Sequence, residues 1–332
     1  MTADTRLDVL AIGNAIVDII ADCDDAFLER EGLTKGMMRL IDAEEATRLY
    51  DHMGPAREIS GGSAGNTAAG VAALGGRAGF IGQVAPDQLG DFYRHDLTAT
   101  GVEFTTPSAD YGVPTARSMV LVTPDAHRTM NTFLGAAQLL PASALDEGQI
   151  ESAAILYLEG YLWDPETPRY AMVKAIDIAR RAGRKIAFTL SDSFCIDRHR
   201  DGFNQLIDRG KIDILFANEA EIVMLAGEAD FDAAVAAVET RVETLVVTRS
   251  ERGAIAVQRG ERAQVAAEPV GKVVDTTGAG DLFAAGFLAG QAQGRSLEQS
   301  LRIGAIAAAE VISHYGARPE ADLKALVAER LG

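Results

Sequence analysis

The stretch Asp275-Thr276-Thr277-Gly278-Ala279-Gly280-Asp281 decides how this chain is interpreted, and the apolar segment Leu282-Phe283-Ala284-Ala285-Gly286-Phe287 follows it directly. A small-residue turn before an apolar segment of helical period predicts a helix start. The first N–H groups of a helix lack intrahelical partners and lie at the positive end of the helix dipole. Glycines let an anion approach these groups closely. A helix start with an acidic first turn is the plainer alternative, but the two bracketing acids favour a phosphate site, with Asp281 placed to accept a proton.

Composition restricts the class of protein. A chain of 332 residues predicts one large α/β domain with an appendage, or two domains. The net charge of −17 argues against a nucleic-acid partner, because binding to phosphates needs clustered Lys and Arg. An anionic substrate would therefore need a local positive site from helix termini, a metal ion or a few arginines. The two cysteines, Cys23 and Cys195, exclude a disulfide framework and a zinc site built from cysteines.

The N-terminal residues Met1-Thr2-Ala3-Asp4-Thr5-Arg6 lack the basic-then-apolar layout of a secretory signal. No apolar stretch approaches the length of a membrane span. We therefore expect a cytoplasmic protein without a membrane partner.

Strand and helix patterns alternate over most of the chain. The continuous apolar run Leu7–Ile12 predicts a buried strand, and the polar residues Asn14 and Asp18 follow it. From Ile155 onward, strand-like and helix-like segments alternate, which predicts a mostly parallel sheet covered by helices on both faces. Residues 117–122 and 128–133 predict a hairpin with a proline turn, part of a small β appendage inserted in the chain.

Two further stretches carry candidate site residues. Small residues fill positions 60–76, where Gly61-Gly62 opens a predicted helix and lets a polar ligand touch the main chain; tight helix–sheet packing is a compatible alternative. Asn218 and Glu221 follow a strand predicted at 212–216, and carboxyl ends of parallel strands are where α/β proteins place their sites. Their spacing suits holding water around Mg²⁺. By themselves, however, these residues favour a helix N-cap with an acidic first turn.

Several familiar motifs are absent. The chain contains no Gly-x-x-x-x-Gly-Lys-Ser/Thr loop, no His-Glu-x-x-His and no Gly-x-Ser-x-Gly. The first predicted strand ends in Gly13-Asn14 without a Gly-x-Gly-x-x-Gly fingerprint, which argues against a dinucleotide-binding dehydrogenase. The main remaining indication of function is the predicted anion-binding loop with Asp281 at its edge.

At this point the motifs resemble a known family. Residues 275–281, called the signature loop below, resemble the C-terminal signature of the ribokinase-like (PfkB) carbohydrate and nucleoside kinases. Gly61-Gly62-Ser63-Ala64-Gly65-Asn66-Thr67 resembles their N-terminal signature, and Asn218-Glu219-Ala220-Glu221 resembles their Asn-x-x-Glu motif. The resemblance covers nearly the whole chain. It implies one kinase domain over 1–332, an α/β three-layer sandwich with a mainly parallel central sheet, and a small β-sheet lid from about 14–55 and 105–135.

The resemblance also implies roles for individual residues. Asp281 would be the general base, and the N–H groups of Gly278, Ala279 and Gly280 would hold the charge on the transferred phosphoryl group. Asn218 and Glu221 would orient Mg²⁺ through water. The implied ATP site is wider and comprises Asn218, Thr248, Gly253, Thr276, Gly278, Gly280 and Gly316. A monovalent cation such as K⁺ is a further candidate cofactor.

The resemblance also implies which residues bind the acceptor. They lie just after the first predicted strand and in the N-terminal signature: Asn14, Asp18, Gly61, Gly62 and Asn66. Carboxylate and amide groups of this kind suit vicinal hydroxyls. Arg128, on the expected lid hairpin, would offset phosphate charge, with a surface role as the alternative. Clamps for a base are expected from Phe133 and Leu134, or from Tyr161 and Trp163.

The choice of acceptor depends on finer resemblances. Ribokinases carry a lysine after the first glycine pair, where this chain has Ser63. The stretches 13–18, 190–194 and 213–219 look closer to adenosine kinases. We therefore expect an ATP-dependent kinase for a primary hydroxyl of a nucleoside, adenosine first, acting as a monomer or homodimer. A free sugar such as ribose or fructose is the alternative acceptor. A nucleotide-dependent oxidoreductase and a non-catalytic ligand sensor are the alternatives from other classes.

Overall fold

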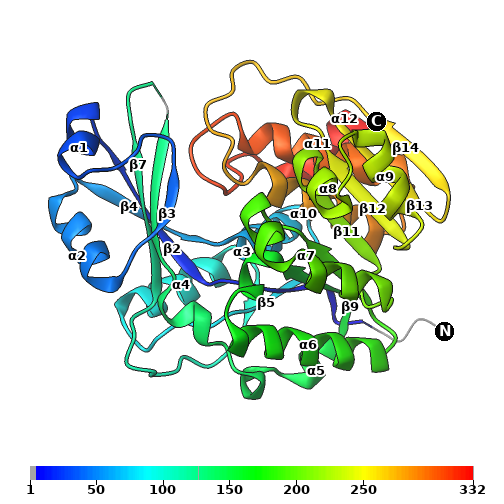
Figure 1. The fold of residues 1–332 in the computed structure, drawn as a ribbon, viewed down its shortest axis with the longest axis horizontal. Helices are drawn as coiled ribbons and strands as arrows, with labels where there is room; N and C mark the ends of the chain where they lie inside the picture. The colour runs from blue at the N-terminus through cyan, green and yellow to red at the C-terminus, as the bar shows by residue number, and fades with distance from the viewer. Residues whose placement is uncertain (1–4, 126, 332) are drawn as a thin grey trace.

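The computed structural model describes residues 5–125 and 127–331, so the expectation about the N-terminal residues falls largely outside the described part. Two separate sheets organise the chain, one of nine strands and one of five. Figure 1 shows the smaller sheet standing beside a larger α/β body. The predicted fold, with a large, mainly parallel sheet and a smaller second sheet, is confirmed.

The nine-stranded sheet has the order β14-β13-β12-β11-β10-β9-β1-β5-β6. Neighbouring strands from β6 to β12 run parallel, while β13 and β14 are antiparallel. The strands are β1 Leu7–Ile12, β5 Ala78–Ile81, β6 Glu103–Phe104, β9 Ala153–Glu159, β10 Lys185–Thr189, β11 Ile214–Asn218, β12 Thr244–Thr248, β13 Ala254–Gln258 and β14 Glu261–Val265. The strand that we placed at 212–216 runs from Ile214 to Asn218, so Asn218 ends this strand and does not follow it. No strand is assigned at 272–274, just before the signature loop.

Helices cover both faces of this sheet. On one face lie α3 Ser63–Ala73, α4 Gln88–Ala99, α10 Ala279–Ala292 and α11 Leu297–Val311, with α12 Leu323–Leu331 packed on α11. On the other face lie α5 Glu147–Glu151, α6 Glu166–Arg181, α7 Ser193–Asp208, α8 Glu219–Ala226 and α9 Phe231–Glu239. Among the residues described, no helix combines the length and the apolar character needed to cross a membrane.

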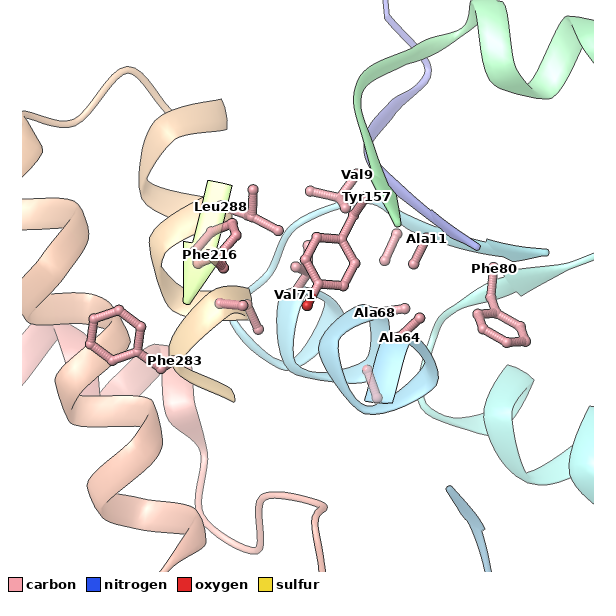
Figure 2. Close-up of a cluster of buried hydrophobic side chains, with 14 of the residues drawn as sticks. Val9, Ala11, Ala64, Ala68, Val71, Phe80, Tyr157, Phe216, Phe283 and Leu288 are labelled. Carbon is pink, nitrogen blue, oxygen red and sulfur yellow. The ribbon is translucent and has the colours of Figure 1, made fainter. Parts of the chain in front are cut away.

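The run of apolar residues in β1 is explained by its central position. Val9 and Ala11 face the core under α3 and α10, whereas Leu10 and Ile12 face the core on the other side of the sheet. A strand buried on both faces has no need of polar alternation. Figure 2 shows the first of these cores, where Ala64 and Ala68 of α3 lie beside β1. The small side chains of α3 let it approach the sheet closely.

The second sheet has the order β3-β8-β7-β2-β4 and bounds β3 Met38–Leu40, β8 Arg128–Phe133, β7 Ala116–Val122, β2 Ile16–Asp22 and β4 Ala56–Gly61. The predicted hairpin is β7–β8, and β4 lies outside our expected range of 14–55. Helices α1 Asp25–Arg30 and α2 Ala43–His52 share a core with one face of this sheet. Strand register puts Asp18 and Arg128 together on the opposite face.

Candidate active site

The start of α10 is shaped by its glycines. Gly278 is the N-cap with φ 78°, a left-handed conformation, and a Cβ there would lie 2.6 Å from the Cβ of Ala317. A Cβ on Gly280 would meet open space. The Ala279 N–H donates a long hydrogen bond of 3.3 Å to the Thr276 carbonyl, which an anion can replace. The α10 start thus has the open backbone that an anion site requires.

Asp275 fixes the shape of the signature loop. Its Oδ1 accepts the Thr277 N–H at 3.0 Å, and its Oδ2 accepts the Gly316 N–H at 2.9 Å. Arg128 reaches the same loop from β8, pairing with Asp275 at 2.7 Å and donating to the Thr277 hydroxyl at 2.9 Å. The Arg128 side chain is only 9% exposed, so a surface role for it is wrong. The second sheet therefore contacts the anion loop directly.

Asp281 is held by α3. Its Oδ1 accepts the Ser63 hydroxyl at 2.6 Å and its Oδ2 accepts the Asn66 side-chain amide at 2.9 Å. Burial raises the pKa of Asp281, opposed by these two hydrogen bonds and by the charge of Arg318. A raised pKa makes this carboxylate a stronger proton acceptor than a free aspartate. Ser63, which we noted only as a departure from ribokinases, is thus a direct partner of Asp281.

Glu159 is a site residue that sequence reasoning missed. Its fully buried carboxylate accepts the N–H and the side-chain amide of Asn14, each at 2.7 Å, and the Ala64 N–H at 2.8 Å. Burial raises the pKa of Glu159 to about 7. An acid at the carboxyl end of the strand predicted from Ile155 was the signal available in the sequence. Glu159 orients Asn14 and satisfies an amide in the first turn of α3.

The glycine pair before α3 makes room for Asp18 and Asn14. A Cβ on Gly61 would lie 2.3 Å from a carboxylate oxygen of Asp18, and one on Gly62 would lie 2.1 Å from the Asn14 carbonyl. Burial raises the pKa of Asp18 to about 7, opposed by Arg128 and Arg318. The structure thus brings the expected acceptor residues together around α3, with Asp281 beside them.

Asn218 and Glu221 form a capping box at the start of α8. The Asn218 Oδ1 accepts the Glu221 N–H at 2.9 Å, while the Glu221 carboxylate accepts the Asn218 N–H at 2.9 Å and its side-chain amide at 2.7 Å. Within the residues described, no group of three or more metal-type side chains gathers. The structure thus shows the helix N-cap that these two residues favour by themselves.

Thr248 and Gly253, which we expected on the ATP side, lie at and just beyond the carboxyl end of β12. Thr248 stands opposite Asn218 in the register of β11 and β12. Gly253, with φ 82°, lies in the β12–β13 turn, where a Cβ would lie 2.0 Å from the Val265 carbonyl. The Tyr161 hydroxyl donates to the Ser191 carbonyl at 3.2 Å, and its pKa is raised by burial and then by the charge of Asp192.

Two of the expected base clamps lie elsewhere. Trp163 is 6% exposed and packs against Phe188 and Phe203 in the core, so it is a core residue. Phe133 pairs with Arg117 and lies on the face of the second sheet away from Asp18. Aromatic character alone did not indicate which face these rings occupy.

Comparisons with known proteins agree with this geometry. A model of the pfkB family of carbohydrate kinases matches residues 32–323. A probable sugar kinase from Rhizobium etli CFN 42 is 49% identical, with a TM-score of 0.92, over 98% of this chain and 99% of that chain. The adenosine kinase from Sinorhizobium meliloti is 50% identical, with a TM-score of 0.91, over 98% and 100%. A fructokinase from Klebsiella pneumoniae is 31% identical over 74% of this chain and 80% of that protein.

Kinases of this family generally use ATP and Mg²⁺ and phosphorylate an alcohol group. The family match spans most of the chain, and its two glycine-rich motifs meet where α3 contacts α10. Both glycine-rich stretches lie within this kinase match, so the alternative of a nucleotide-dependent oxidoreductase has no separate support. The chain belongs to the PfkB carbohydrate kinase family and is a phosphotransferase with an alcohol group as acceptor.

Proposed function

We propose that the protein transfers the γ-phosphate of ATP to the primary hydroxyl of a ribose-containing nucleoside, adenosine first. One observation carries the proposal: Asp281, in the first turn of an open helix start, is aimed by Ser63 and Asn66 toward the acceptor residues. A carboxylate in this position can take the proton of a hydroxyl while the α10 start faces the phosphoryl group.

The chain's own residues perform four tasks in this proposal. Asp281 accepts the acceptor's proton, and the N–H groups of Gly278, Ala279 and Gly280 stabilise the charge that develops on the phosphoryl oxygens. Arg128, which pairs with Asp275 in this structure, offsets part of that charge. Asn218 and Glu221 would orient water around a bound Mg²⁺ ion. ATP with Mg²⁺ supplies the phosphoryl group and offsets part of its charge.

A nucleoside acceptor is supported by the second sheet. Asp18 shares a face with Ile59 and Ser118 in one row, and with Ile20 and Val120 in the next. A carboxylate for ribose hydroxyls therefore stands beside apolar side chains suited to a base. The 50% identity to the S. meliloti adenosine kinase supports the same acceptor. The 49% identity to the R. etli probable sugar kinase supports a free sugar such as ribose or fructose as the second candidate.

A coupled ADP-release assay over nucleosides and sugars tests the proposal. We expect substrate-dependent turnover, with kcat/KM highest for adenosine. A preference of orders of magnitude for fructose or ribose would overturn the nucleoside assignment and keep the kinase. No turnover with any acceptor, alongside intact ATP binding, would favour the ligand-sensor alternative.

Three smaller expectations belong to the same proposal. Activation by K⁺ can be read from the assay by replacing it with Na⁺. Light scattering distinguishes a monomer from a homodimer, and fractionation of the source cells tests the cytoplasmic location. We propose that K⁺ is a candidate cofactor, that the protein is a monomer or a homodimer, and that it is cytoplasmic.

A further inference from the structure

Arg318 is a half-buried cation that no motif indicated. It follows α11 in the segment after Gly316, yet its guanidinium donates to the Gly65 carbonyl at 2.9 Å and to the Ser60 carbonyl and hydroxyl at 2.5 and 3.0 Å. Ser60 lies near the end of β4, and Gly65 lies in the first turn of α3. Arg318 therefore joins the C-terminal segment to both sides of the glycine pair that opens the acceptor site.

These contacts do not neutralise the positive charge of Arg318. Carbonyl and hydroxyl oxygens are neutral, and its Nε is buried without a hydrogen-bond partner in the described part of the chain. Burial lowers the pKa of Arg318, and the groups that oppose this shift are Tyr93, Asp96, Asp18 and Asp281. Acidic groups from α4, β2 and α10 thus all act electrostatically on Arg318.

Asp18 and Asp281 stand in a crowded acidic environment. The groups acting on Asp281 are Ser63, Asn66 and Arg318, and its charge in turn is felt by Asp18, Tyr157, Glu159 and Tyr161. The groups acting on Asp18 are Arg128, Arg318, Asp281 and Asp275. Like charges and burial both disfavour ionised carboxylates, so two negative charges here need a fixed cation.

We infer that Arg318 is a positioning residue of the acceptor site: its guanidinium fixes the glycine entrance of α3 and supplies the charge that lets Asp18 and Asp281 be ionised together. Arg128 cannot fill this role throughout the reaction, because it sits on the second sheet and the proposed function directs it to the phosphoryl group. Arg318 lies outside the second sheet, in the segment after α11, and is held by its hydrogen bonds to Ser60 of β4 and Gly65 of α3. The kinetic part of this inference rests on the proposed function, whereas the electrostatic part does not.

The direct test uses the unliganded enzyme. The side-chain carboxyl groups of ¹³C-labelled aspartates are titrated by NMR in wild type, R318M and R318K, with D18N and D281N to assign the signals. Removing a nearby positive charge raises the pKa of a carboxyl group, so we expect both aspartates to titrate about one pH unit higher in R318M. In R318K they should titrate near the wild-type pH. Unchanged titration in R318M would overturn the inference.

A matched control separates charge from packing. Arg94 also donates to two main-chain carbonyls, those of Phe104 at 2.9 Å and Thr106 at 2.6 Å. We expect R94M to leave both titrations unchanged, whereas equal shifts in R94M and R318M would indicate a general structural effect and overturn the inference. If R318M does not fold, R318Q serves the same test, because it also lacks the charge while keeping an amide donor.

Kinetics give the second readout. With the acceptor that turns over in the panel, the acid limb of the kcat/KM profile should move about one pH unit upward in R318M and return in R318K. A uniform loss at every pH, without displacement of the limb, would contradict a charge role. Should no acceptor turn over, the proposed function fails while the NMR titration still decides on Arg318.

Discussion

Helices α3 and α10 meet at the site and begin alike, with a glycine N-cap at positive φ: Gly62 at 84° and Gly278 at 78°. Their first turns are completed differently. In α3 the buried carboxyl group of Glu159 accepts the Ala64 N–H, so an acceptor of the protein itself occupies that helix start. In α10 the Ala279 N–H has only a long bond to the Thr276 carbonyl. One helix start is filled by the protein, and the other is open to an anion.

This difference divides the work between the helices. Because α3 is closed by Glu159, its side chains Ser63 and Asn66 are fixed and can aim Asp281. Because α10 is open, its dipole and N–H groups are available to a phosphoryl group. A third start, that of α8, is closed by its own Asn218–Glu221 capping box. The comparison predicts distinct consequences when each start is altered.

The largest effect is expected for D281N. This variant removes the proposed base while keeping the size of the side chain, so kcat should fall roughly 10²–10⁴-fold. ATP affinity, measured by calorimetry, should change little, because the α10 backbone is intact. Turnover close to wild type would exclude the general-base role and leave α10 as a binding element only.

Two glycine variants examine the open start of α10. G278A forces a non-glycine residue to φ 78° against Ala317, which should cost about 1–3 kcal/mol of stability and lower turnover. G280A places its methyl group in open space, so its unfolding free energy should match wild type, while the methyl blocks the approach of the phosphoryl group. A G280A enzyme with normal kinetics would mean that the anion does not contact this backbone.

These features differ in how far the sequence could reveal them. The signature loop, Asp281 and the glycine pair were predicted because each is a local pattern with a local physical reason. Glu159, Ser63 and Arg318 were not assigned their roles, because their partners are distant in sequence: Glu159 lies 95 residues from Ala64, and Arg318 lies 253 from Gly65. Strands β4 and β14 were missed because they are largely exposed and carry charged residues.

The closed start of α3 predicts a pH effect on stability. The folded-state pKa of Glu159 is raised from 4.5 to about 7, so its contribution to the free energy of unfolding is present below pH 4.5 and is lost as the pH rises through 7. In E159Q this dependence disappears, so urea unfolding should give a flatter stability profile between pH 5 and 8 than in wild type.

E159Q should also lose about 1–3 kcal/mol, because a glutamine oxygen cannot replace both carboxylate oxygens as acceptors. The KM for the acceptor should rise more than the KM for ATP, since Asn14 and α3 lose their support. A wild-type slope of stability with pH in this variant would show that Glu159 does not titrate in this range.

The smallest effect is expected at α8. N218A removes a helix cap and should cost about 1 kcal/mol in unfolding free energy. D230A removes the corresponding cap of α9, where the Asp230 carboxylate accepts the Ala233 N–H, and is the matched control. If Asn218 also orients water around Mg²⁺, only N218A should raise the Mg²⁺ concentration needed for half-maximal turnover. Identical Mg²⁺ dependence in both variants would mean that Asn218 only caps α8 and has no role in binding Mg²⁺.

The division between the two helix starts is tested most directly by a crystal structure with a non-hydrolysable ATP analogue, Mg²⁺ and adenosine. We predict the γ-phosphate at the N–H groups of Gly278–Gly280, and the primary hydroxyl of the acceptor about 2.6–3.2 Å from the Asp281 carboxylate. Glu159 should still hold the Ala64 N–H. A γ-phosphate bound away from α10, or an acceptor hydroxyl turned away from Asp281, would contradict it.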